Sequence, residues 1–99
     1  MRLTAQQVKR IAELIQVVIG TQARTYVFGS RLDDNARGGD LDLMLEVSES
    51  IDNPALLSAQ LSAKISRVMH GRKVDVLLSA PNLARLPIHD IAYKEGQLI

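Results

Sequence analysis

The sequence predicts an α/β (α+β) fold in which a mixed sheet of three to four strands is flanked by helices. Residues 40–47 alternate polar and aliphatic side chains, as a strand does. Residues 4–20 carry apolar side chains at helical spacing. Residues 40–78 read as strand, helix and strand, an order that supports parallel pairing through a crossover. With 99 residues, we expect one domain.

The first helix is marked at both ends. Thr4 and Gln7 have the spacing of a capping box, in which each side chain bonds the backbone N–H of the other residue. Gly20 can end the helix in a left-handed conformation. The apolar face that we expect to pack on the core consists of Val8, Ile11, Ala12, Ile15, Val18 and Ile19.

A short strand over residues 25–28 stops at Gly29 and Ser30, and a polar loop follows over residues 31–39. A glycine lets a phosphate approach the backbone closely, and a serine hydroxyl can hold a phosphate oxygen. Arg31, in the loop, is a candidate bidentate contact to a triphosphate. Taken alone, the Gly-Ser pair also fits an ordinary turn and the arginine a solvated side chain.

The next strand covers residues 40–47, and its alternation places Asp40, Asp42, Met44 and Glu46 on one face and the aliphatic residues on the core side. A second helix then begins with Asn53 as its cap and Pro54 at its first position. Its expected buried stripe consists of Leu57, Leu61, Ile65 and Val68, and Gly71 follows its end.

The last third of the chain completes the fold. Residues 73–78 form a third strand that is apolar except for Asp75 and its first residue. A short helix is expected from near Pro87 to before Gly96, and residues 97–99 can add an edge strand.

Three acids are the candidate metal ligands. Asp40 and Asp42 lie on one face of a strand, roughly 6.6 Å apart at a rise of ~3.3 Å per residue. Asp75 lies in a strand that we expect to be buried, where a charged acid is costly unless it is paired or bound to metal. Carboxylates and phosphate oxygens are the ligands that Mg²⁺ prefers. The alternative for the first two acids is a solvated strand face.

Composition and charge exclude several classes of protein. Twelve Lys and Arg against eleven Asp and Glu give a net charge of +1, and there are three aromatic residues, so a nucleic-acid-binding module is disfavoured. Cysteine is absent, which excludes disulfides and thiolate metal sites. We find no signal peptide or membrane span and expect a cytoplasmic protein.

Rival motifs are missing as well. The sequence contains no Walker A loop and no glycine-rich dinucleotide fingerprint. The two histidines, His70 and His89, are isolated, so neither a zinc site nor a histidine-based catalytic triad is supported.

The combination of Val27-Phe28-Gly29-Ser30, nine intervening residues, Asp40-Leu41-Asp42-Leu43 and a later Val74-Asp75-Val76 resembles a known superfamily. It is similar to the DNA polymerase beta-like nucleotidyltransferases, and more narrowly to their minimal nucleotidyltransferase (MNT) family. The resemblance covers nearly the whole chain and implies that residues 1–99 form a single minimal nucleotidyltransferase domain.

This resemblance implies a Mg²⁺-dependent transfer of a nucleoside monophosphate, which we expect to be AMP from ATP, to an acceptor hydroxyl. By position, Gly29 and Ser30 would hold the triphosphate, while Asp40 and Asp42 would ligate Mg²⁺. Asp75 would bind a second Mg²⁺ ion and help to activate the acceptor. Two close metals can clamp the attacking and leaving oxygens of an in-line displacement.

The resemblance also implies a partner. MNT proteins are often the antitoxins of HEPN-domain toxins, and some add AMP to a tyrosine of the toxin. Since little chain remains for an acceptor-binding domain, we expect recognition of the acceptor in trans, by a partner or in a homodimer. The alternative is a catalytically inert MNT-fold antitoxin that acts by binding alone.

Overall fold

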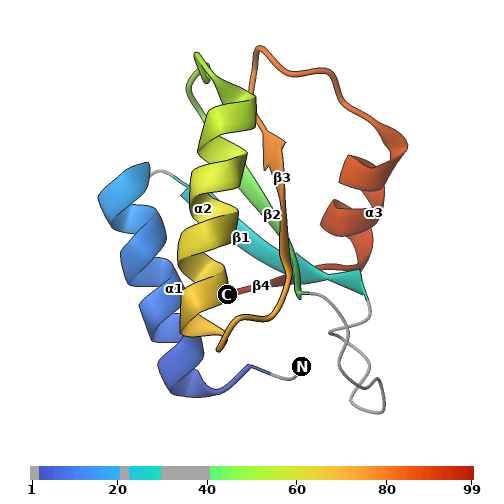
Figure 1. The fold of residues 1–99 in the computed structure, drawn as a ribbon. Helices are drawn as coiled ribbons and strands as arrows, with labels where there is room; N and C mark the ends of the chain where they lie inside the picture. Colours follow the sequence, from blue (N-terminus) through green and yellow to red (C-terminus); the bar gives the residue numbers. More distant parts are fainter. Residues whose placement is uncertain (1–2, 21–22, 30–40) are drawn as a thin grey trace.

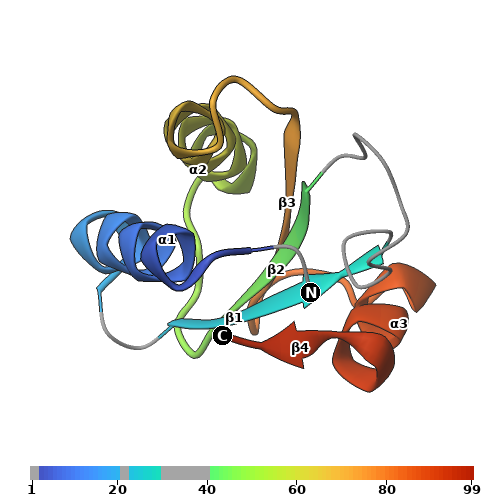
Figure 2. The same ribbon diagram turned by 90° about the horizontal axis from the view of Figure 1, so that it is seen from below.

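The computed structural model describes residues 3–20, 23–29 and 41–99. A four-stranded mixed sheet lies between two helices on one face and a third helix on the other (Figures 1 and 2). This arrangement confirms the predicted fold class. In chain order the elements are α1 (Ala5–Val18), β1 (Ala23–Phe28), β2 (Leu41–Val47), α2 (Pro54–Val68), β3 (Val74–Ser79), α3 (Pro87–Glu95) and β4 (Gln97–Leu98).

The strand order is β3-β2-β1-β4. β2 pairs with β3 in parallel and with β1 antiparallel, and β4 pairs antiparallel with β1. The parallel pair is the one predicted from the strand–helix–strand order, with α2 as its crossover. As a result, the end of β1 and the starts of β2 and β3 lie at the same end of the sheet (Figure 1).

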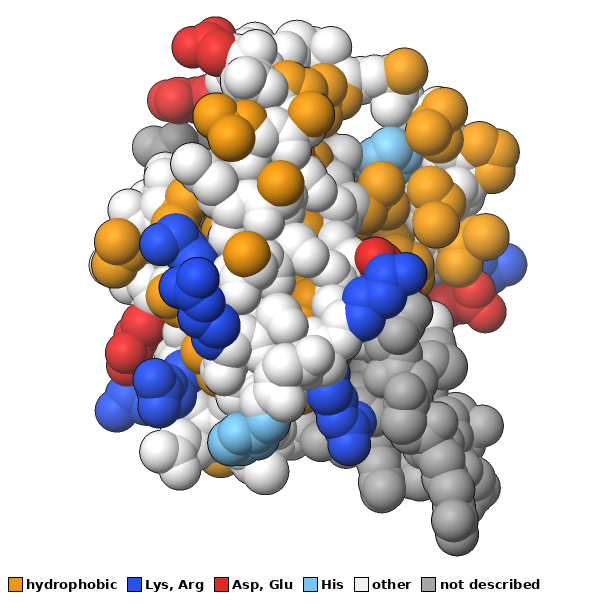
Figure 3. Space-filling model, viewed as in Figure 1, with side chains coloured by type: hydrophobic (Ala, Val, Ile, Leu, Met, Phe, Trp, Pro, Cys, Tyr) orange, Lys and Arg blue, Asp and Glu red, His pale blue; other side chains and the backbone are white. Residues whose placement is uncertain are grey.

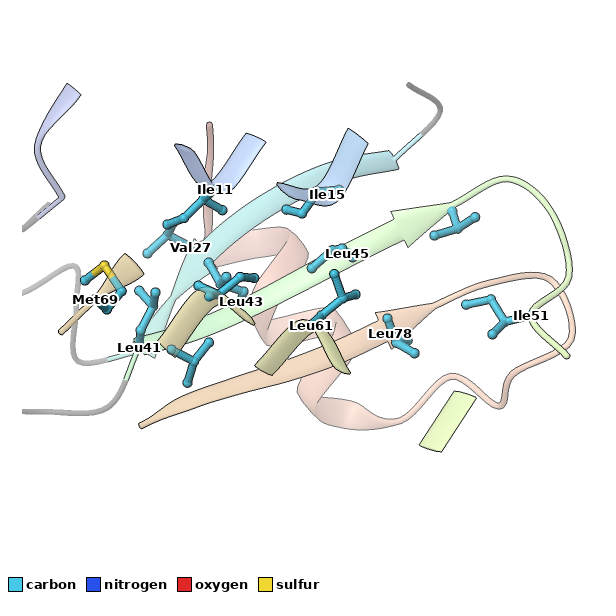
Figure 4. Close-up of a cluster of buried hydrophobic side chains, with 13 residues drawn as sticks. Ile11, Ile15, Val27, Leu41, Leu43, Leu45, Ile51, Leu61, Met69 and Leu78 are labelled. Carbon is cyan, nitrogen blue, oxygen red and sulfur yellow. The ribbon is translucent and has the colours of Figure 1, made fainter. Parts of the chain in front are cut away.

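The main core lies between the sheet and the pair α1 and α2 (Figure 4). The aliphatic side chains of β2 point into it, which confirms the period-two prediction. Its fully buried members include Ile11 from α1, Val27 from β1, Leu41, Leu43 and Leu45 from β2, and Leu61 and Ile65 from α2. Ala12, expected on the buried face of α1, is exposed.

A smaller core lies on the other face, under α3. Met44 is 0% exposed there and packs with Phe28 and Ala92. The alternation predicts this methionine on the same face as the acids, and it is buried because α3 covers the middle of that face. The polar residues of β2 are therefore separated into Asp42 at one end and Glu46 at the other.

The predicted helix starts are confirmed by hydrogen bonds. The Gln7 backbone N–H donates to Thr4 Oγ1 at 3.1 Å, and the Thr4 N–H donates to Gln7 Oε1 at 2.9 Å. The Leu56 N–H donates to Asn53 Oδ1 at 3.2 Å. The first strand begins at Ala23, two residues earlier than the sequence predicts.

His70, two residues after the end of α2, has a φ of 59°, a left-handed conformation that is strained for a residue with a Cβ. Because the side chain is exposed, replacing it removes little packing. We expect His70→Gly to raise the free energy of unfolding by about 1 kcal/mol, measured by urea denaturation. His70→Ala, which keeps a Cβ, is the matched control and should give no comparable gain. An unchanged urea midpoint for the glycine variant would contradict this expectation.

In the ranges that the structure describes, none of the helices combines the length and the apolar character that crossing a membrane requires.

Candidate active site

The parallel pairing of β2 and β3 places two of the predicted acids side by side. Asp42 and Asp75 are register partners, so their side chains leave the sheet on the same face from strands ~4.8 Å apart. Asp42 is half-buried and Asp75 is exposed. Their carboxylates can therefore contact a common cation from one side of the sheet.

The burial expected for Asp75 is wrong. β3 is an edge strand of the sheet, and the Asp75 side chain is open to solvent. The cost of burying a charge therefore does not explain this residue. Its position beside Asp42 follows from the strand register alone.

Gly29 lies at the same end of the sheet as Asp42. It follows Phe28, whose register partner on β2 is Asp42, and it has a left-handed φ of 78°. A Cβ on Gly29 would lie 2.4 Å from Asp42 Oδ2, a distance that real side chains do not tolerate. The glycine thus lets the backbone turn pass directly beside the Asp42 carboxylate.

The structure brings together Gly29, Asp42 and Asp75, while the other predicted site residues, Ser30, Arg31 and Asp40, lie outside the described residues. Within the described ranges, no group of three or more His, Cys, Asp or Glu side chains is arranged to hold a metal ion. The two described carboxylates nevertheless fit Mg²⁺, which usually takes one or two protein carboxylates and completes its shell with phosphate oxygens and water.

A second polar cluster lies at the opposite end of the same face. The Tyr93 hydroxyl of α3 donates to Glu46 Oε2 at 2.6 Å and lies 2.9 Å from Ser79 Oγ. The Arg85 guanidinium lies 4.6 Å from the centre of the Tyr93 ring. Burial, and then the hydrogen bond to Glu46, raise the pKa of Tyr93, so the hydroxyl is a proton donor at neutral pH. This cluster fixes α3 to β2 and β3.

The sequence alone does not predict this cluster. Glu46 follows the alternation of the acids and so resembles a further site residue, but it lies four positions along β2 from Asp42. Because Tyr93 satisfies its carboxylate, Glu46 has a structural role.

Comparisons with known proteins identify the fold. No protein-family model matches the chain, and no curated protein matches its sequence. A chain of a toxin–antitoxin crystal structure with AMP-PNP has a TM-score of 0.68 and 18% identity, covering 97% of this chain and 72% of that chain. A chain of the tri-AMPylated Shewanella oneidensis HEPN toxin in complex with MNT antitoxin has a TM-score of 0.65 and 19% identity, covering 94% and 68%.

A third similar structure is that of the toxin–antitoxin MntA-HepT, with a TM-score of 0.66 and 19% identity over 96% of this chain and 70% of that chain. At these identities the likeness is one of fold. The chain therefore shares its fold with chains of MNT antitoxin–HEPN toxin complexes, in agreement with the resemblance found in the sequence.

Proposed function

We propose that this chain is a Mg²⁺-dependent nucleotidyltransferase that transfers AMP from ATP to a hydroxyl of a partner protein, a HEPN-type toxin, and thereby acts as an antitoxin. The observation that carries the proposal is the register that pairs Asp42 with Asp75 beside the left-handed Gly29. The shared fold supports it, since one similar structure contains AMP-PNP and another a tri-AMPylated HEPN toxin.

In this proposal Asp42 and Asp75, together with Asp40, hold Mg²⁺, and Gly29 and Ser30 hold the triphosphate with Arg31 beside them. Bound Mg²⁺ would neutralise phosphate charge and favour ionisation of the acceptor hydroxyl. The acceptor oxygen bonds the α-phosphorus, and the bond from that phosphorus to pyrophosphate breaks.

The exposure of Asp75 has a role in this reaction. An acceptor that belongs to another molecule must approach the acids from solvent, and Asp75 is the solvent-facing member of the described pair. Its carboxylate can accept the proton of the incoming hydroxyl. Asp42, which is half-buried, would lie on the side of the site that holds the nucleotide.

The test is to incubate the chain with the product of its neighbouring gene, as the candidate toxin, together with Mg²⁺ and ATP labelled at the α- or the γ-phosphate. We expect the toxin to retain α-label only, and we expect removal of the metal with EDTA to abolish labelling. Restoring Mg²⁺ in excess over EDTA is the control and should recover the rate. Retention of γ-label, or no transfer from any nucleoside triphosphate, would contradict the proposal.

A binding-only antitoxin is the second candidate, and the exposure of Asp75 favours it. An exposed carboxylate costs an inert protein little, so its presence alone does not require catalysis. The two candidates differ in the effect of Asp42→Asn on neutralisation of the toxin in cells. An enzyme loses neutralisation with this variant, whereas a binding module retains it.

A further inference from the structure

The carbonyls on the outer edge of β3 are capped by side chains. The Leu41 N–H donates to the Lys73 carbonyl at 3.0 Å, so odd-numbered residues of β3 face β2. The carbonyls of Val74, Val76 and Leu78 consequently point away from the sheet. In an edge strand such groups are usually open to pairing with another chain.

Three serines of α2, spaced four residues apart, bond carbonyls along this side of the chain: two of them bond outward carbonyls of β3, and the third bonds a carbonyl just before β3. This spacing places them on one stripe of the helix, alongside β3. Ser58 Oγ donates to the Val76 carbonyl at 2.8 Å, Ser62 Oγ donates to the Val74 carbonyl, and Ser66 Oγ donates to the Arg72 carbonyl at 2.6 Å.

His89 of α3 caps the remaining carbonyl. Its ring is 4% exposed; Nδ1 accepts from the Leu86 N–H at 2.9 Å, so Nε2 carries the proton and donates to the Leu78 carbonyl at 2.9 Å. The histidine that looks isolated in the sequence thus links α3 to β3. An incoming strand would find the acceptors of this edge already bonded, which disfavours strand addition.

Beside this capped edge lies a shallow, open apolar groove of about 390 Å³ between the start of α2 and the segment that leads into α3. Among the residues that the structure describes, no charged side chain lines it. Its two polar lining residues, Ser58 and His89, are two of the edge caps. We call this feature the β3-edge groove. Its other lining residues are Pro54, Ala55, Val76, Leu77, Leu78, Leu83, Ala84 and Leu86.

Exposed apolar side chains continue from this groove onto α3. Leu86 is 52% exposed, and Ile88 and Ile91, one helical turn apart on α3, are 44% and 48% exposed. Figure 3 shows hydrophobic side chains gathered over α3 and the segment before it. The nearby charges of Arg85 and Asp90 pair with each other at 2.7 Å, so the rim has little net charge. Contiguous apolar surface of this kind marks interaction sites.

We propose that the β3-edge groove docks the apolar face of an amphipathic helix of the protein that carries the acceptor hydroxyl; this rests on the proposed function. The capped carbonyls argue against a strand, and the uncharged lining favours apolar side chains of a helix. The groove also adjoins the candidate site, because its floor begins at Val76, next to Asp75. A helix seated there would hold its protein within reach of that carboxylate.

The test measures, by isothermal titration calorimetry, binding of the full chain to the acceptor protein that the labelling experiment identifies. Ala55→Glu adds a charge and bulk to the groove at the N-terminal turn of α2, which has no acid, so the helix itself should tolerate the change. Leu86→Glu does the same on the opposite wall. Gln60→Glu adds the same charge on an exposed α2 position outside the groove and is the matched control.

We expect both groove variants to weaken binding at least 30-fold, the usual effect of a hot spot, and the control to stay within about 3-fold. Unchanged affinity of both groove variants, or no binding by the unaltered chain, would overturn the inference. Sedimentation of the chain alone should show a monomer. A dimer that Leu86→Glu dissociates would assign the groove to a second copy and overturn it too.

Failure of the docking inference can be told from failure of the proposed function. If the groove variants weaken binding but the unaltered chain transfers no AMP, the proposed function is wrong and the docking inference stands. Transfer of AMP by Leu86→Glu with unaltered kcat/KM refutes the docking and leaves the function in place. Asp42→Asn should bind the toxin as the unaltered chain does, since Asp42 lies outside the groove.

Discussion

Replacing Asp42 by Asn is expected to lower the rate of AMP transfer about 10³-fold or more. The carboxamide keeps the size of the side chain but removes the negative charge that would face Mg²⁺, and groups that stabilise transition-state charge contribute effects of this order. The free energy of unfolding should change little. Initial rates with α-labelled ATP, measured together with urea denaturation, test both statements.

Glu46→Gln is the matched control for this variant. Glu46 lies on the same strand and the same face as Asp42, but at the other end of the strand. There its carboxylate accepts a hydrogen bond from the Tyr93 hydroxyl at 2.6 Å. We expect it to cost about 1 kcal/mol of stability through the weakened hydrogen bond and to change the transfer rate only a few-fold. If Asp42→Asn stays within 10-fold of the unaltered rate, or both variants lose activity equally, the assigned role of Asp42 is wrong.

Local signals predict the elements of this fold well because each depends on neighbours in sequence. The capping box of Thr4 and Gln7, the Asn53 cap and the alternation along β2 are all decided within a few residues, and the structure confirms each. The parallel pairing of β2 and β3 follows from the intervening helix.

Burial depends on distant parts of the chain, and there the sequence is a weaker guide. Met44 lies on the strand face that the alternation assigns to the polar residues, yet α3, more than forty residues later in the chain, covers it. Asp75 has apolar neighbours and is exposed because it lies in an edge strand, on the face opposite to the one that buries Val74 and Leu78. The linking role of His89 requires two elements to meet, and no local pattern indicates it.

Replacing Gly29 by Ala would have two effects, backbone strain and a clash with the Asp42 carboxylate, and Gly71→Ala separates them. Gly29 and Gly71 have nearly the same left-handed φ, 78° and 84°. An added Cβ would meet Asp42 Oδ2 at 2.4 Å in the first case and nothing within 4 Å in the second. Both alanine variants should therefore lose about 1–2 kcal/mol of stability through strain, as measured by urea denaturation.

Only Gly29→Ala is expected to lose AMP transfer as well, by about 10²-fold, because its methyl group must displace the Asp42 carboxylate, and a misplacement of about 1 Å can cost that much. Gly71→Ala, which carries the same strain without a contact to Asp42, should transfer AMP at nearly the unaltered rate under conditions where both variants are folded. Equal activity of the two variants would mean that the close approach of the turn to Asp42 does not matter for the reaction. The comparison thus tests whether this glycine acts on the site or only on the turn.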